Sequence, residues 1–341
     1  MIYQATIIIP TIKINSLLIE VVDNILSNRQ NVSINIISNE TSKVFQSKEN
    51  VKIITTLSNK MSKKRNLGVK EAMTKFVGFI DSDAYPNKDW LINGIKILEN
   101  NPDIGIVTGP EISFPNQSFI QNIIGLCNKS FLITGSHSFR KSLSKSRFYS
   151  EASGCNILMR KDDYIILDGM DENLYLGEDR EFSERMIHKL KKKIFFAEES
   201  WVYHKDRGLI GFFFQRFARG EAINDTIKVI IKSLKKNFSL RHLFKQRLEL
   251  FAPFLFIIFL LSYFVIFIIN EWKYLYFAII YFYLLIIIIN SFKLCKFKIH
   301  YLPFIIMVLI IGTLTPGIAQ LIKLLKLKFD ISKFYRNSND Y

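Results

Sequence analysis

Cysteine is scarce in this sequence of 341 residues, and its positions argue against the structures that depend on it. The three cysteines, Cys127, Cys155 and Cys295, are far apart, odd in number and without a Cys-x-x-Cys pair. A disulfide framework needs paired cysteines, and a structural zinc site needs ligands at short spacings, so we expect neither. This usage of cysteine is typical of a reducing compartment.

Patterns of nucleic-acid-binding modules and of a signal peptide are also missing. We find no helix-turn-helix, zinc finger or RNP pattern, so nucleic acid is not an expected partner. The formal net charge of +16 instead favours phosphorylated small molecules or anionic lipids. The apolar run in residues 1–10 has no basic region before it and is too short for a secretory signal. We therefore expect the soluble part to stay in the cytosol.

Charged residues are rare in three long stretches of the C-terminal part. Each stretch has about the 20 residues that cross a bilayer, and the stretches are 251–269, 274–290 and 302–322. After the second stretch come Lys293, Lys296 and Lys298, which the positive-inside rule places in the cytosol. Pro316-Gly317 interrupts the third stretch, so both a true span and a re-entrant or interfacial segment stay open.

In the N-terminal part, apolar runs alternate with amphipathic segments, as they do in an α/β domain. The predicted strands are 5–9, 32–37, 51–55, 76–80 and 155–159, with a strand-like run over 194–204. The predicted helices are 16–28, 61–74, 118–133 and 178–192, the second with Ser62 as its N-cap. We expect a mostly parallel sheet with helices on both faces, and a mobile loop over 136–150.

Two carboxylates follow one predicted strand directly. Asp81 and Asp83 stand two positions apart at a strand-to-loop corner, where both can reach one Mg²⁺ or Mn²⁺ ion. A solvated turn is the alternative, because Asp and Ser favour turns. Pro10 and Asn39 also end predicted strands, and ligands bind at the carboxyl ends of the strands in such sheets.

Further motifs surround this pair in a fixed order. Arg65-Asn66-Leu67-Gly68 precedes it, and Gly177-Glu178-Asp179 and then His204 follow it. With the early Ile-Ile-Pro10, this order resembles the family 2 glycosyltransferases of the GT-A fold over roughly residues 5–220. The resemblance implies an α/β domain of the nucleotide-diphospho-sugar transferase type. The predicted organisation is a GT-A domain over 1–205, a basic interfacial segment over 206–250, about three transmembrane helices over 251–322 and a basic tail over 323–341.

The resemblance also implies roles for individual residues. The implied donor-binding residues are Pro10, Thr11, Asn39, Arg65, Asp81 and Asp83, and the implied ligands of Mg²⁺ or Mn²⁺ are Asp83, Asp81 and His204. Asp179 is the implied catalytic base, with Glu178 beside it, and Gly154 and Asn156 are implied to lie near the acceptor. The alternatives are capping acids at a helix start, a packed or surface histidine and a simple turn.

Two segments depart from the family pattern. Where the family usually has an acidic pair followed by Gly-Ser, this chain has Asn39-Glu40, which puts a preference for uracil in doubt. The segment 215–220 is similar to the Gln-x-x-Arg-Trp motif of processive synthases, but its spacing differs and the Trp is missing. We interpret Arg216 and Arg219 as contacts to a phosphate or to the membrane surface.

The expected function is a metal-dependent, inverting glycosyltransferase in a membrane, the plasma membrane if the source is prokaryotic. It is expected to be multi-pass, with its catalytic domain in the cytoplasm and membrane lipids as partners. A nucleotide-diphospho-sugar is the expected donor, and a lipid-linked molecule or a glycan is the expected acceptor. One alternative is a processive polysaccharide synthase, which needs more spans and an intact motif. The other is an inactive membrane scaffold, which has no use for an acidic pair facing phosphate.

Overall fold

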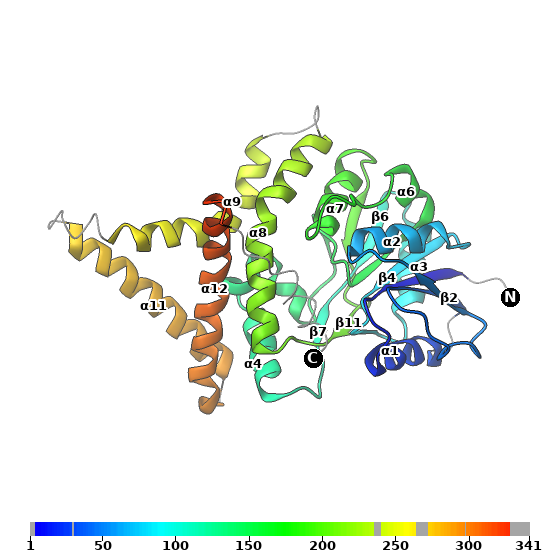
Figure 1. Ribbon diagram of the computed structural model, residues 1–341, viewed down its shortest axis with the longest axis horizontal. Coiled ribbons are helices and arrows are strands. Elements are labelled where there is room, and N and C mark those ends of the chain that lie inside the picture. The colour runs from blue at the N-terminus through cyan, green and yellow to red at the C-terminus, as the bar shows by residue number, and fades with distance from the viewer. Residues whose placement is uncertain (1–3, 29–30, 235–239, 264–271, 297, 328–341) are drawn as a thin grey trace. The chain divides into compact units, whose positions relative to one another are not determined.

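The computed structural model describes residues 4–28, 31–234, 240–263, 272–296 and 298–327 (Figure 1). The chain divides into two compact units. The sheet unit comprises Met1–Phe114, Ser142–Lys205 and Asp225–Phe238, and the helical unit comprises Pro115–Lys141, Asp206–Asn224 and Ser239–Tyr341.

The sheet unit contains two β-sheets and helices that cover the larger one. The larger sheet is formed by β1 (Ala5–Pro10), β2 (Val32–Ser38), β3 (Val51–Thr55), β4 (Phe76–Ile80), β6 (Ile104–Thr108), β8 (Arg147–Tyr149), β9 (Asn156–Arg160) and β10 (Lys193–Phe196). The smaller sheet is formed by β5 (Ala84–Pro86), β7 (Glu111–Ser113) and β11 (Val202–His204). The helices of this unit are α1 (Ser16–Ser27), α2 (Met61–Lys70), α3 (Trp90–Asn100), α6 (Lys161–Ile166) and α7 (Glu178–His188).

Helices cover both faces of the larger sheet, which explains why its central strands are apolar throughout. Successive side chains of a strand point to opposite faces. Ile7 and Ile9 of β1 therefore pack with residues of α1 and α3 in one core cluster. Ile8 packs with residues of α2, α6 and α7 in the other. Figure 1 shows α1 and α2 on opposite sides of these strands.

The strand order of the larger sheet is β3-β2-β1-β4-β9-β6-β10-β8. The pairs among β3, β2, β1 and β4 are parallel, which confirms the predicted arrangement for the first half of the sheet. β9 is antiparallel to both of its neighbours, β4 and β6, and this reversal was not predicted. Because β9 runs in the opposite direction, its first residue, Asn156, pairs with Ile80, the last residue of β4. The segment just before β9 is thereby brought to the carboxyl end of β4.

Several predicted boundaries differ from the structure. α2 begins at Met61 with Lys60 as its N-cap, so the prediction of Ser62 as the cap is wrong. The stretch 136–150 is not wholly a loop, because it contains most of the 3₁₀ helix η1 (Gly135–Lys141) and β8, which pairs with β10. The predicted helix over 118–133 is divided into α4 (Phe119–Asn128) and α5 (Phe131–Thr134). A capping box of Ser118 and Gln121 starts α4.

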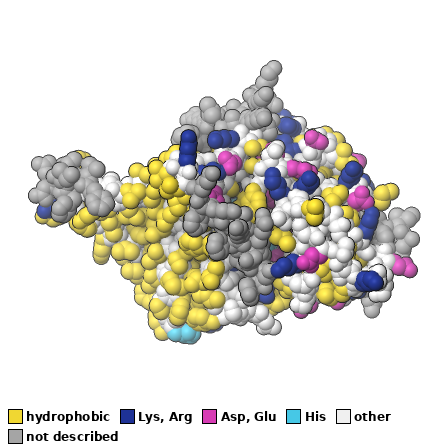
Figure 2. Space-filling view, viewed as in Figure 1, with side chains coloured by type: hydrophobic (Ala, Val, Ile, Leu, Met, Phe, Trp, Pro, Cys, Tyr) yellow, Lys and Arg dark blue, Asp and Glu magenta, His cyan; other side chains and the backbone are white. Residues whose placement is uncertain are grey.

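The helical unit contains α4, α5, η1 and the C-terminal helices. The latter are α9 (Leu240–Leu261), α11 (Lys273–Cys295), η3 (Ile299–Tyr301) and α12 (Leu302–Leu324). α8 (Leu209–Leu234) begins in this unit and ends in the sheet unit. In Figure 2, hydrophobic side chains gather over the helices of this unit, and many of those on α11, such as Tyr274 and Phe282, are exposed.

Two helices in the described part of the chain are long and apolar enough to cross a membrane, Lys273–Cys295 and Ile299–Leu324. They contain the predicted spans 274–290 and 302–322. The first predicted span, 251–269, is described only in part: Leu250–Leu261 is a shorter apolar helix, and residues 264–269 lie outside the described residues. α12 continues through Pro316, so the helix is not interrupted at Pro316-Gly317.

Candidate active site

The two sheets of the sheet unit bring Asp81, Asp83 and His204 together. Asp81 follows the last residue of β4, and Asp83 precedes β5. β11 is antiparallel to β5, with His204 opposite Ala84, and this pairing places the imidazole beside both carboxylates. His204 Nε2 lies 3.5 Å from Asp83 Oδ1 and 4.0 Å from Asp81 Oδ2.

The orientation of His204 leaves a ring nitrogen facing these carboxylates. Nδ1 lies 3.0 Å from the carbonyl oxygen of Lys205. A carbonyl only accepts hydrogen bonds, so we assign a proton to Nδ1, and Nε2 is the ring nitrogen that faces the carboxylates. The side chains of Asp81 and Asp83 are 33% and 34% exposed. Two accessible carboxylates and an imidazole nitrogen form a donor set that fits Mg²⁺ or Mn²⁺.

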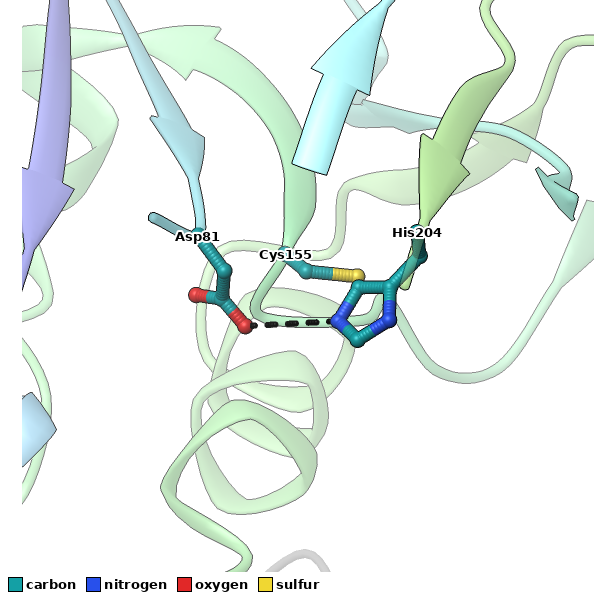
Figure 3. Close-up of side chains that lie close together, drawn as sticks. All are labelled: Asp81, Cys155 and His204. Carbon is teal, nitrogen blue, oxygen red and sulfur yellow. Dashed lines mark ion pairs between the residues drawn. The ribbon is translucent and has the colours of Figure 1, made fainter. Parts of the chain in front are cut away.

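A thiol lies next to the same carboxylate and imidazole. Cys155 precedes β9, whose antiparallel direction brings it to Asp81. Ligand atoms of Asp81, Cys155 and His204 all lie within 4.8 Å of one another, and the dashed line in Figure 3 marks the ion pair of Asp81 and His204. Cys155 is buried and was not among the predicted site residues. The three residues are far apart in the sequence, so no ligand spacing signals them.

Arg65 of α2 links this carboxylate pair to α7. It is buried, with Nη1 donating to Glu178 Oε1 at 2.7 Å and Nη2 donating to Asp81 Oδ1 at 3.1 Å. Burial alone lowers the pKa of Arg65, but Asp81, Glu178 and Asp179 together raise it above its usual value. The guanidinium therefore remains charged. Because its two terminal nitrogens bind the protein, the predicted direct contact of Arg65 with the donor is not favoured by this geometry.

Because Gly154 has no side chain, the guanidinium of Arg65 can pack directly against its backbone. A β-carbon at this position would lie 2.8 to 3.2 Å from atoms of the guanidinium group. The carbonyl of Gly154 also accepts from Arg65 Nη2 at 3.2 Å. Its amide donates to Asp179 Oδ2 at 3.1 Å. Gly154 thus contacts both the cation and the predicted base.

Glu178 and Asp179, at the start of α7, lie in different environments. Glu178 is buried against Arg65, and burial raises its pKa to about 7, with Asp179 adding to the shift and Arg65 opposing it. Asp179 is partly exposed, and its Oδ1 accepts from the amide of Arg180 at 2.8 Å. The two neighbouring acids are therefore distinguished by accessibility: Asp179 can meet a substrate, whereas Glu178 is held inside by an ion pair.

The predicted donor-binding residues at the ends of β1 and β2 are joined by a buried lysine. Lys64 Nζ donates to the carbonyl oxygen of Thr11 and, at 2.6 Å, to Asn39 Oδ1. Asn39 Nδ2 donates to Asn59 Oδ1 at 3.1 Å. Burial lowers the pKa of Lys64 to about 8. No role for Lys64 was predicted, and the signal that could have found it is its place beside Arg65 in the motif.

Three other predicted residues have surroundings that differ from the predicted roles. Asn156 is fully buried, accepts from Trp90 Nε1 at 2.7 Å and donates to the carbonyl of Ser200 at 2.9 Å, which favours a structural role over acceptor contact. Arg216 and Arg219 belong to the helical unit. Arg216 is buried and donates to the carbonyls of Ile133 and Gly312, so its position does not favour contact with a membrane surface, whereas Arg219 is exposed.

Comparison with known proteins finds a family match in the first part of the chain. Residues 6–165 match the family described as Glycosyl transferase family 2. The matched range includes Asp81, Asp83 and Cys155 but ends before Asp179 and His204. No curated protein matches the chain.

Proposed function

From the premise that residues 6–165 form a glycosyl transferase family 2 domain, we propose that this glycosyltransferase is metal-dependent, inverting and membrane-associated. The observation that carries the proposal is the meeting of Asp81, Asp83 and His204 beside the acidic start of α7. A nucleotide-sugar donor follows from the family, and the further steps below follow from the side chains.

Asp83, Asp81 and His204 are the residues that would hold Mg²⁺ or Mn²⁺. A cation bound there would neutralise the charge of the departing diphosphate. Pro10 ends β1, the neighbour of β4, and Thr11 follows it, whereas Asn39 follows β2, the next strand of the sheet. These residues offer the nucleotide its contacts. Lys64 fixes the amide of Asn39, because it binds the oxygen of that side chain.

Asp179 is the proposed general base. Its carboxylate is accessible and is oriented by two backbone amides, those of Gly154 and Arg180. It would accept the proton of the acceptor hydroxyl as the sugar is transferred. Glu178 is engaged by Arg65, and we assign it, with Arg65, to positioning α7 against Asp81.

The acceptor is proposed to be a lipid-linked molecule or a glycan held near a membrane. The support is the pair of long apolar helices, Lys273–Cys295 and Ile299–Leu324, together with the exposed hydrophobic side chains of the first. We propose several crossings, membrane lipids as partners and a cytoplasmic sheet unit. Because the donor site is thereby held close to the bilayer, an acceptor with a lipid anchor reaches it without leaving the membrane.

A donor screen tests the proposal. Detergent-solubilised protein is incubated with UDP-, GDP-, dTDP- and CMP-sugars in Mn²⁺, and the release of nucleotide is measured. We expect hydrolysis of one donor class in Mn²⁺ and none in EDTA. Equal hydrolysis in EDTA would contradict the metal role, and inertness toward every donor would favour the scaffold. Long polymeric products with an acceptor would favour a processive synthase.

A further inference from the structure

We propose that Asp81, Cys155 and His204 bind Zn²⁺, and that this ion competes with the cation of the donor complex. The competition rests on the proposed function, whereas the binding of Zn²⁺ does not. The inference starts from Cys155, a soft ligand placed among groups that otherwise suit a hard cation. In Figure 3 its sulfur lies beside the imidazole of His204.

The distances are close to those that a tetrahedral zinc site requires. Zn²⁺ binds sulfur at about 2.3 Å and nitrogen or oxygen at about 2.0–2.2 Å, which sets neighbouring ligands about 3.3–3.6 Å apart. The three ligand atoms are within 4.8 Å of one another, and Asp81 Oδ2 is 4.0 Å from His204 Nε2. Side-chain rotations that move the ligand atoms by up to about 1 Å bring them to the spacing of a tetrahedral zinc site.

The ligands are already oriented by neighbouring groups. His204 is held through Nδ1 by the carbonyl of Lys205, which directs Nε2 to the site. Asp81 uses Oδ1 for Arg65, so that Oδ2 is the oxygen facing His204. Ser153 Oγ lies 3.4 Å from Cys155 Sγ. Such outer contacts raise the affinity of metal sites, because they fix the ligand atoms before the ion arrives.

The two kinds of cation prefer different ligand atoms. Mg²⁺ and Mn²⁺ prefer oxygen and are served by Asp81 and Asp83, whereas Zn²⁺ prefers thiolate and imidazole and is served by Cys155 and His204. When Zn²⁺ binds, the thiol of Cys155 loses its proton to solvent and coordinates as thiolate. The full ligand sets are Asp81, Asp83 and His204 for Mg²⁺ or Mn²⁺ and Asp81, Cys155 and His204 for Zn²⁺. Because both sets use Asp81 and His204, one cation excludes the other.

Cobalt absorption tests the binding directly, with Co²⁺ as the probe and the full chain in detergent. Coordination by Cys155 is expected to produce a thiolate-to-cobalt charge-transfer band that Zn²⁺ removes. Cys155→Ser should abolish the band. The double variant Cys127→Ser/Cys295→Ser, which keeps Cys155 as its only cysteine, should retain it. A wild-type protein without the band, or a band that survives in Cys155→Ser, would overturn the proposal.

A second variant protects the test against a failure of Cys155→Ser to fold. His204→Ala keeps the thiol and removes the nitrogen ligand. We expect its affinity for Co²⁺ to fall by at least about tenfold, since even the loss of an outer-shell partner typically costs 10–100-fold. An affinity equal to that of the wild type would refute the assignment of His204.

Inhibition of transfer tests the competition. Zn²⁺ is titrated into assays supported by Mg²⁺, and each protein is compared with its own activity before Zn²⁺. We expect Cys155→Ser to need at least about tenfold more Zn²⁺ for half inhibition. Equal inhibition of both proteins would overturn the competition. A protein inert toward every donor would contradict the proposed function. The cobalt test of metal binding would not be affected by that outcome.

Discussion

Arg65 is a buried cation that lies between Glu178 and Asp81. Replacement by methionine, Arg65→Met, would leave buried acidic groups without their partner. Removal of one member of a buried ion pair typically costs about 3–5 kcal/mol, so we expect a loss of about 3 kcal/mol of unfolding free energy. The control is Lys52→Met, whose 2.7 Å pair with Glu71 is exposed and screened by solvent, so that its loss should change the unfolding free energy much less. Chemical unfolding of both variants checks this, and equal losses would contradict it.

Substitutions of Asp179 and Glu178 should lower turnover to different extents. Asp179→Asn keeps the shape of the side chain but removes the proton acceptor, so turnover should fall on the order of 10²–10⁴-fold. Donor affinity should stay nearly unchanged, because the proposed metal ligands are Asp81, Asp83 and His204. Glu178→Gln should be milder, since Glu178 faces Arg65. The reverse order would show that the two acids are assigned the wrong way round, and a loss below a few-fold in both would exclude either as the base.

The raised pKa of Glu178 has a consequence for stability. Its folded-state value is about 7 against an ordinary 4.5, so the folded chain holds the proton more tightly than the unfolded chain. The stabilisation is therefore full below about pH 4.5 and is lost as pH rises through about 7. With about 1.4 kcal/mol per pKa unit, the full loss is on the order of 3–4 kcal/mol, of which roughly 2–3 kcal/mol falls between pH 5 and 8. Unfolding curves at pH 5 and 8 should show a smaller loss in Glu178→Gln, and identical losses would refute this.

The sequence predicted the site residues that occur in motifs and missed those that only the fold brings in. Asp81, Asp83, Asp179 and His204 could be proposed from the sequence because their residue types and order are characteristic. Cys155 was missed because it reaches Asp81 through the reversed direction of β9, which apolar periodicity does not reveal. Arg65 was named from the sequence, but its ion pairs with Glu178 and Asp81 were not predicted. A basic residue in this motif can bind either a phosphate or acidic side chains of the protein.

Individual strands and helices were easier to predict than their arrangement. β1 and β4 are buried throughout because both faces of the sheet are covered there, and their apolar runs give their positions to within a residue or so. The smaller sheet has strands of three residues, too short to produce a pattern. Yet its pairing of β5 with β11 is what brings His204 to the carboxylates.

The start of α7 depends on a glycine. Gly177 has φ of +83°, and a β-carbon there would lie 2.6 Å from Thr226 Oγ1. Gly177→Ala combines backbone strain with a close contact, so we expect a loss of about 1–3 kcal/mol of stability and reduced turnover. Gly208→Ala is the matched control, because nothing lies within 4 Å of a β-carbon at that position. Thermal unfolding compares the two, and similar melting temperatures would refute the dependence.

Segments from parts of the chain that differ in composition pack together in the structure. The sequence assigned residues 118–133 to the N-terminal domain because they precede the apolar half. In the structure, Ile124 and Cys127 of α4 share a buried cluster with Ile305 and Leu309 of α12 within the helical unit. Such contacts between distant segments leave no local pattern, so a boundary drawn from composition did not include them.

The number of crossings decides on which side of the membrane the sheet unit lies. Lys293, Lys296 and Lys298 follow the span in α11 and should be cytosolic. If residues 251–269 also cross, the sheet unit and these lysines share a side; if only α11 lies between them, they are on opposite sides. We expect the shared side, because residues 251–269 are apolar and long enough to span.

Two single-cysteine variants settle this arrangement. In a background with the three native cysteines changed to serine, Met73→Cys marks the sheet unit, where Met73 is 94% exposed, and Lys298→Cys marks the exposed loop after α11. A membrane-impermeant maleimide is applied to inside-out and right-side-out vesicles. Both cysteines should react in inside-out vesicles alone, since that orientation turns the cytosolic side outward. Reaction of Met73→Cys and Lys298→Cys in opposite preparations would show that residues 251–269 do not cross, and the sheet unit would then lie outside if the lysines are cytosolic.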